Sequence, residues 1–321
     1  MLRTISMLFW IGLAAAVGTA SAQAWPVKPV SLIVGNAPGA SVDTGARLIA
    51  NSLAAKLGQT VVVDNRPGAD GYIAAGAIVR SAPDGYTLFL ASQSVMAIDP
   101  HIRKSMPFDL ERDFTPIAVM VDDTFAHGLF AHPSLPFTTL QGMIVYARAH
   151  PGKLTVAISV PHFSMLASWL DKRTGIQTLQ VPYKSANQAV QDMLAGRVSL
   201  FLTNFGFFEQ FLKDGKVRVL AVTRPVPDWP QVPSYASIFP DFTFTTFFSL
   251  VGPGGMAREL AYRINRAAAA VVEAPSFNQD MAKIRWRNLD GARTPEGTAE
   301  FIRQVRADWG GFIKEIGLQP Q

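Results

Sequence analysis

Short apolar runs rich in β-branched residues alternate along the chain with longer segments in which apolar residues recur every three or four positions. Residues 30–34 and 61–63 are two such runs, and residues 44–57 between them have helical spacing and end before Gly58. A β-branched run of this length is typical of a buried parallel strand, and the longer segment is typical of an amphipathic helix. A helix through Ile73 and Ile78 and a strand at residues 87–91 continue the alternation. Strand–helix units of roughly 25 to 30 residues predict parallel strands joined by right-handed helical crossovers.

The alternation restarts near Phe125 and predicts a second α/β unit. Thr138 or Thr139 is expected to cap one of its helices, and Ser185 with Gln188 fits a capping box that opens another. Residues 159–163 are expected to form a loop before a helix at residues 164–173. Further strands are expected at residues 117–121 in the first unit and at residues 129–131, 154–158, 177–181, 200–202 and 217–222 in the second.

The last third of the chain is predicted to return to the first unit. Five prolines between Arg224 and Pro240 indicate an irregular connection, and the apolar residues 242–251 are expected to form a returning strand. Three helices follow, the last one opened by Thr294 as its cap, and they should coat the first unit. We therefore predict an α/β protein with two Rossmann-like lobes, residues 25–125 with 243–321 as lobe 1 and residues 126–242 as lobe 2.

The N-terminus has the pattern of a secretory signal peptide. Arg3 precedes an apolar stretch from Met7 to about Ala20 that is shorter than the roughly 20 residues of a spanning helix. Small residues then offer cleavage after Ala22 or after Ala24. Residues 1–24 are therefore expected to be removed on export, which predicts a periplasmic protein.

Charge and cysteine usage exclude several classes of protein. The formal net charge is +5, and the basic residues are scattered without the clusters that nucleic-acid binding requires. Cysteine is absent. Disulfides, thiolate metal sites, a cysteine nucleophile and a lipid-modified cysteine are thus excluded.

The loop after the first strand has the features of an anion-binding loop. It runs from Gly35 to Val42, has small side chains and leads into a helix N-terminus, where unpaired N–H groups and the helix dipole favour negative charge. Neither Gly-Lys-Ser/Thr nor G-x-G-x-x-G occurs in it, so it is not a nucleotide loop. We expect it to bind the carboxylate of a small solute; the alternative is an ordinary turn without a ligand. Asp43 in the first helical turn is expected to pair with Arg47 and to serve the structure.

The sequence offers little support for catalysis. It contains five histidines, none of them in H-E-x-x-H, and no G-x-S-x-G nucleophile elbow. We predict no catalytic residues, no cofactor and no metal site, and a secreted hydrolase is the most distant alternative.

Several motifs identify a family resemblance. They are Gly58-Gln-Thr-Val-Val-Val-Asp-Asn-Arg-Pro-Gly-Ala69, the segments at residues 83–88 and 113–118, and Val-Pro-Tyr-Lys at residues 181–184. With these motifs the chain resembles the Bug family, the periplasmic solute receptors of tripartite tricarboxylate transporters, from Trp25 over essentially the whole mature chain. The resemblance implies type II periplasmic-binding-protein architecture, with two α/β lobes joined by two crossing strands and a carboxylate-bearing solute between them.

Two ligand loops of the family can be located, and both depart from its pattern. In the first, Gly39 and Asp43 match, whereas Asn36 and Ala40 differ. In the second, the family's Ser-Gly-x-Gly-Ser is replaced by a sequence without glycine that contains Pro161, which lacks an N–H. The second loop should therefore grip a ligand differently.

The resemblance and the helix termini together give the candidate ligand-binding residues. The first loop should act mainly through its backbone N–H groups. A second helix N-terminus lies near Lys184, and two such termini facing one cleft would suit a dicarboxylate; Lys184 could instead be a solvated charge. Thr203 and Asn204 end a strand at the same sheet edge, where turn formation is the alternative. The candidates are Asn36, Ala37, Gly39, Ala40, Ser41, His162, Phe163, Ser164, Tyr183, Lys184, Ser185, Ala186, Thr203 and Asn204.

The expected function is that of a monomeric periplasmic receptor. It would capture a small organic acid between two lobes and deliver it to the membrane permease of a tripartite tricarboxylate-type transporter. A receptor of the same fold that signals to a membrane sensor kinase is one alternative. A copy with altered or lost ligand binding is another.

Overall fold

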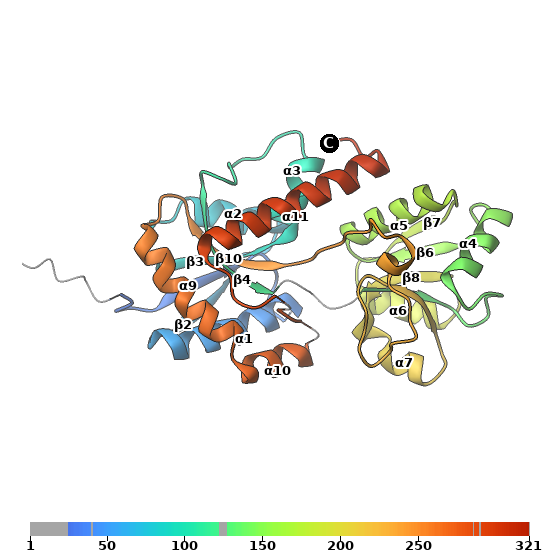
Figure 1. Ribbon diagram of the computed structural model, residues 1–321, viewed down its shortest axis with the longest axis horizontal. Coiled ribbons are helices and arrows are strands. Elements are labelled where there is room, and N and C mark those ends of the chain that lie inside the picture. The colour runs from blue at the N-terminus through green and yellow to red at the C-terminus, as the bar shows by residue number, and fades with distance from the viewer. Residues whose placement is uncertain (1–24, 40, 122–126, 285, 289, 321) are drawn as a thin grey trace, which may run out of the picture.

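The computed structural model describes residues 25–39, 41–121, 127–284, 286–288 and 290–320. Within these residues the chain forms two five-stranded sheets, with the strand orders β2-β1-β3-β10-β4 and β7-β6-β8-β5-β9. Figure 1 shows them as two bodies, with helices around each sheet and with the long helix α11 reaching from the first toward the second. We call each sheet with its surrounding helices the first and the second lobe.

The first sheet combines three parallel strands with a returning strand. Strand β1 pairs in parallel with β2 and β3, as the helical crossovers predicted. Strand β10 enters the sheet from the other lobe and runs antiparallel to β3 and β4. The strands are β1 (Val30–Val34), β2 (Val61–Asn65), β3 (Thr87–Ser92), β4 (Phe114–Val121) and β10 (Phe248–Pro253).

The second sheet repeats this plan. Strand β6 is parallel to β7 and β8, and β5, the first strand after the chain enters this lobe, is antiparallel to β8 and β9. In both sheets the antiparallel strand is thus the one that arrives from the other lobe. The strands are β5 (His127–Ala131), β6 (Thr155–Ile158), β7 (Leu179–Pro182), β8 (Leu200–Asn204) and β9 (Arg218–Val222).

The helices follow the predicted alternation. The side chain of Thr139 accepts a hydrogen bond from the amide of Gly142 and caps α4, and Thr294 caps α11 in the same way. The helices of the first lobe are α1 (Ser41–Leu57), η1 (Ala69–Gly71), α2 (Tyr72–Val79), η2 (Ser94–Ile98), α3 (Asp99–Ile102), α9 (Arg258–Val272), α10 (Pro275–Lys283) and α11 (Pro295–Ile316). Those of the second are α4 (Leu140–Ala149), α5 (Pro161–Thr174), α6 (Ala186–Leu194), η3 (Phe205–Phe207), α7 (Glu209–Lys213) and α8 (Tyr235–Ile238).

Two local expectations were wrong, and one segment of helical structure was not predicted. Helix α5 begins at Pro161 rather than Ser164, because proline suits the first helical position, where its missing N–H costs nothing. His162 and Phe163 therefore lie in a helical turn and not in a loop. Residues 94–102, for which no element was expected, form the π-helical turn η2 and the short helix α3. The returning strand begins only at Phe248, because the aromatic residues before it pack between the lobes.

One apolar core runs through both lobes. It contains strand residues of the first sheet, strand residues of the second sheet and the buried face of α11. The indole ring of Trp169 on α5 stacks on Phe312 of α11 with ring centroids 5.8 Å apart, and Phe244 lies 5.0 Å from Trp309. Helix α11 therefore covers the first lobe, as expected, and also packs against the second. Among the described residues, no helix is both long and apolar enough to cross a bilayer.

Candidate functional site

A cavity of about 560 Å³ lies between the two lobes. The first lobe contributes Gly35, Asn36, Ala37 and Val42 after β1, the loop after β2, and the segment from the end of β3 to Arg103. The second lobe contributes the start of α5, with Val160, Pro161, His162 and Met165. We call this space the interlobe cavity. Its walls come from the carboxyl ends of parallel strands, where ligands of open α/β sheets bind.

Two glycines bring the first-lobe loops together. A Cβ atom placed on Gly35 would lie 2.9 Å from the Cα atom of Gly71, closer than side-chain carbons approach a backbone. The side-chain amide of Asn65 at the end of β2 donates to the carbonyl of Asn36 at 3.0 Å. The loop after β1 and the loop after β2 thus form one continuous wall of the interlobe cavity.

The carboxylate of Asp43 fixes the loop after β1 through hydrogen bonds. This carboxylate accepts hydrogen bonds from the amide of Gly39 at 2.9 Å, from Nδ2 of Asn65 at 2.9 Å and from Nε of Arg47 at 3.0 Å. These donors, with Arg47 the largest contributor, lower the pKa of Asp43 from 3.8 to about 2. The pair with Arg47 confirms the structural role expected for Asp43, and the Gly39 amide, expected to face a ligand, is bonded to this carboxylate instead.

The N-terminal ends of α2 and α5 face the interlobe cavity from opposite lobes. Gly71 is the N-cap of α2, Val160 is the N-cap of α5, and both residues line the cavity. In the described structure neither cap makes a side-chain hydrogen bond and neither first turn holds an acidic residue, whereas α1 has Asp43 in its first turn. The positive ends of α2 and α5 are therefore left without a compensating carboxylate from their own first turns.

Most polar side chains on the cavity wall come from residues 92–103, a segment that the sequence reasoning missed. Ser92 ends β3, and Gln93 and Ser94 follow it directly, so the rule that strand ends form the site could have found them. Gln93 is only 6% exposed, and no hydrogen bond reaches its Oε1 within the described residues. Arg103 adds a cation; its Nε lies 3.8 Å from a carboxylate oxygen of Asp99, and its guanidinium group lies 4.3 Å from the ring centroid of Tyr72.

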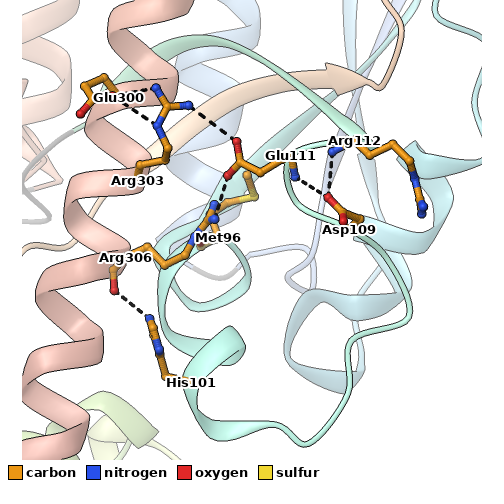
Figure 2. Close-up of polar contacts among 8 residues, drawn as sticks. All are labelled: Met96, His101, Asp109, Glu111, Arg112, Glu300, Arg303 and Arg306. Atoms are coloured by element: carbon orange, nitrogen blue, oxygen red, sulfur yellow. Dashed lines mark hydrogen bonds and ion pairs between the residues drawn. The ribbon is translucent and has the colours of Figure 1, made fainter.

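Helix α11 anchors this segment, as Figure 2 shows. The side chain of Arg306 donates from Nε to the carbonyl of Met96 at 3.0 Å and pairs through Nη1 with Glu111 at 2.8 Å. The carbonyl oxygen of Arg306 lies 2.8 Å from Nε2 of His101. Residues 94–102 therefore keep their irregular helical conformation through contacts from the C-terminal part of the chain.

His162 lines the interlobe cavity, and its ring packs near the rings of His127, Phe163 and Phe244. Its imidazole ring is half-buried, and burial lowers its pKa to about 4. His127 in β5 is buried. Its pKa is lowered to about 3, mainly by burial and to a smaller extent by the charges of the nearby His162 and Arg224. Both imidazoles are therefore neutral near pH 7. Phe163 is 4% exposed and packs 5.0 Å from the His127 ring, as part of the core.

The predicted residues around α6 lie elsewhere. Ser185 caps α6 by accepting from the amide of Gln188 at 3.4 Å, which confirms Ser185 as the predicted cap. Lys184 is exposed, and Ala186 packs on the core of the second lobe. Tyr183 donates its hydroxyl hydrogen to Asp192 at 2.9 Å.

The structure brings only part of the predicted site to the interlobe cavity. Asn36, Ala37 and His162 line it. Ser164 and Tyr183 line a neighbouring cavity. Thr203 is buried in β8, and Asn204 caps η3 by accepting from the amide of Gly206 at 2.9 Å. Ala40 lies outside the described residues, and Ser41 begins α1 with a side chain that is likewise outside them.

The chemistry of the cavity suits binding of an anion. Among the side chains that line the cavity, the positive charge of Arg103 and the negative charge of Asp99 cancel. The N-terminal ends of α2 and α5 therefore supply the net positive potential. Among the described residues, no group of three or more His, Asp or Glu side chains is arranged to hold a metal ion.

Comparison with known proteins agrees with this geometry. Residues 45–318 match the profile of the tripartite tricarboxylate transporter family receptor. The chain belongs to this receptor family. One relative of this receptor is the protein BugT of Bordetella pertussis, 30% identical over 99% of each chain. The predicted family is thus confirmed.

Solved structures confirm the predicted fold of the receptor. The structure of Rpa4515 from R. palustris with adipate is 29% identical, has a TM-score of 0.78, and matches 92% of this chain and 100% of its own. The periplasmic binding protein BugD is 26% identical with a TM-score of 0.75, over 92% of this chain and 100% of its own. Like these neighbours, the receptor has the architecture of a periplasmic solute-binding protein, a class that binds solutes rather than transforming them.

Proposed function

We propose that the protein captures a small organic acid in the interlobe cavity and delivers it, in a closed form, to the permease of a tripartite tricarboxylate-type transporter. One observation carries the proposal: the N-termini of α2 and α5, neither of which has a side-chain cap, face a single cavity from opposite lobes. A carboxylate held by both would contact both lobes at once. Such a ligand favours closure because it binds the closed state better than the open one.

The remaining features of the proposal come from the sequence and from relatives. Export through a cleavable signal peptide at residues 1–24, a monomeric state and the absence of catalysis all fit a transport receptor. The adipate in the Rpa4515 structure supports a carboxylate as the ligand class. Within the interlobe cavity we assign carboxylate contacts to the start of α5 and the start of α2, with Gln93 and Arg103 as side-chain partners.

Calorimetric titration of the purified protein with mono- and dicarboxylic acids tests this proposal. We expect binding of at least one acid, which mass spectrometry then recovers unchanged. Arg103→Met should weaken binding by roughly 10- to 100-fold, since a hydrogen bond to a charged group contributes about 1.5–3 kcal/mol. Arg303→Met, on an exposed face of α11, is the matched control and should bind normally. Chemical conversion of a bound acid, or no binding of any acid, would overturn the proposal.

A further inference from the structure

A second cavity of about 620 Å³ adjoins the interlobe cavity. Ile102, Val160, Pro161 and Met165 line both spaces. Its other walls come from α5, from β7 and from the C-terminal end of α11 with the residues that follow it. We call this second space the side chamber. Because these four residues line both spaces, the two spaces adjoin along one boundary.

Four polar side chains of the side chamber, those of Ser164, Ser168, Gln180 and Tyr183, already have partners within the protein. The hydroxyl group of Ser164 donates to Oε1 of Gln180 at 2.5 Å, and Nε2 of Gln180 donates to Ser168 at 3.0 Å. The hydroxyl of Tyr183 donates to Asp192. These groups therefore do not need a ligand to satisfy their hydrogen bonds.

Apart from Ser159 and Gln319, the rest of the lining is apolar, and part of it is exposed. Ile102, Ile316 and Leu318 are each half-buried, and Val160 on the shared boundary is 36% exposed. Among the described residues, the lining of the side chamber includes no charged side chain. A hydrocarbon surface would gain by covering these side chains, whereas a charge placed there would lose its hydration without gaining a partner.

We propose that the ligand is an amphipathic monocarboxylic acid whose apolar body fills the side chamber. Its carboxylate lies at the helix N-termini of the interlobe cavity, and its aliphatic or aromatic portion extends past Val160 and Met165. The inference rests on the proposed function and specifies the substrate class of the same site. A second carboxylate at the far end of a long acid would enter the apolar chamber, so the site discriminates against long dicarboxylates.

A homologous series of acids tests the chamber. Straight-chain monocarboxylic acids of roughly two to ten carbons, and dicarboxylic acids of matched length, are titrated into the full mature chain by calorimetry. Once the chain enters the chamber, each added methylene should tighten binding about fourfold. The matched dicarboxylates should bind more weakly than the monocarboxylates at the long end of the series.

Two variants locate the effect. Ile316→Trp fills the chamber from a residue that does not line the interlobe cavity, and should weaken binding of the long acids at least tenfold while leaving short acids unchanged. Ile238→Trp, at an exposed isoleucine on α8, is the control and should change neither. Circular dichroism melting establishes that both variants fold.

The outcomes separate this inference from the proposed function. If short acids bind and affinity does not rise with chain length, or if Ile316→Trp leaves long acids unaffected, the chamber is not a ligand subsite and the receptor function stands. If no acid of any length binds, the proposed function fails and the chamber assignment fails with it.

Discussion

The carboxylate of Asp43 joins three segments of the first lobe: the loop after β1, the first turn of α1 and the end of β2. Its partners are the Gly39 amide, Arg47 and Asn65. A carboxylate in the first turn of a helix is already favoured by the dipole, and these donors stabilise it further. The residue next to a candidate ligand loop thus supports the shape of the loop.

We expect Asp43→Asn to lower the free energy of unfolding by about 1–2 kcal/mol near neutral pH, because charge-assisted hydrogen bonds are lost. The folded-state pKa of about 2 lies below the ordinary 3.8, so the carboxylate stabilises the protein above about pH 4, and this stabilisation is lost as the pH falls toward 2. Denaturant unfolding of both proteins across this range should therefore show the difference shrinking with acid. Asp228→Asn, at an exposed carboxyl group, is the control. A difference that stayed constant down to pH 2 would contradict the assignment.

Gly35 is required for the close approach of two loops. We expect Gly35→Ala to destabilise the protein by about 1–3 kcal/mol and to weaken carboxylate binding, because the new Cβ atom would force the Gly71 backbone away. Gly311→Ala on α11 has open space around its Cβ position and should be neutral or stabilise by up to about 1 kcal/mol. Thermal melts and titration of both variants make the comparison. Normal binding by Gly35→Ala would mean that the loop contact does not shape the site.

Single residues differ in how far their roles follow from sequence. The roles of Asp43 and Ser185 were predicted because capping and first-turn charge depend on neighbours within four positions. The place of Gln93 and Arg103 on the cavity wall depends on packing against α11, which lies about 200 residues later in the chain. The local sequence pattern could not predict this contact between distant parts of the chain.

At the scale of elements, the strands and long helices were predicted by hydrophobic period and capping, and the main exception is the segment at residues 94–102. Residues 94–102 include Asp99-Pro100, which interrupts a local helical pattern, and the segment is too short to show a period. Its conformation is fixed by Arg306 and the carbonyl contact to His101 (Figure 2). Tertiary contacts therefore determine the element that contributes most of the polar cavity wall.

Arg306→Ala tests this dependence of one element on another. The Met96 carbonyl would lose its donor, and we expect a loss of about 1–3 kcal/mol in stability together with weaker carboxylate binding, since Gln93 and Arg103 flank the loosened segment. Arg303→Ala on the same helix removes only pairs with the exposed Glu300 and Glu111 and should change stability by less than about 1 kcal/mol. Chemical denaturation and calorimetric titration measure both effects. Equal behaviour of the two variants would show that Arg306 does not support the wall.

At the scale of the whole molecule, the two lobes are coupled through aromatic side chains as well as through the connecting chain. Trp169 stacks on Phe312, and its indole N–H donates to Glu315 on α11 at 3.1 Å. Arg173 of α5 also pairs with Glu315 and with Asp241. The last turns of α11, a helix of the first lobe, therefore also pack into the core of the second lobe. For the lobe closure proposed above, we expect this contact to act as the pivot, because close-packed aromatic rings are hard to separate.

This coupling predicts that the protein unfolds in one transition, since a core shared between lobes makes either lobe unstable without the other. Differential scanning calorimetry should give a calorimetric enthalpy close to the van't Hoff enthalpy for the native chain. Phe312→Ala removes the stacked ring between the lobes; it should cost about 3–5 kcal/mol and broaden or split the transition. Phe277→Ala, buried on α10 in the core of the first lobe alone, should cost a similar amount without splitting it. Because the two variants delete the same side chain from equally buried positions, a split seen in both would reflect general destabilisation. A split confined to Phe312→Ala would place the cooperativity of the molecule at the contact between α11 and α5.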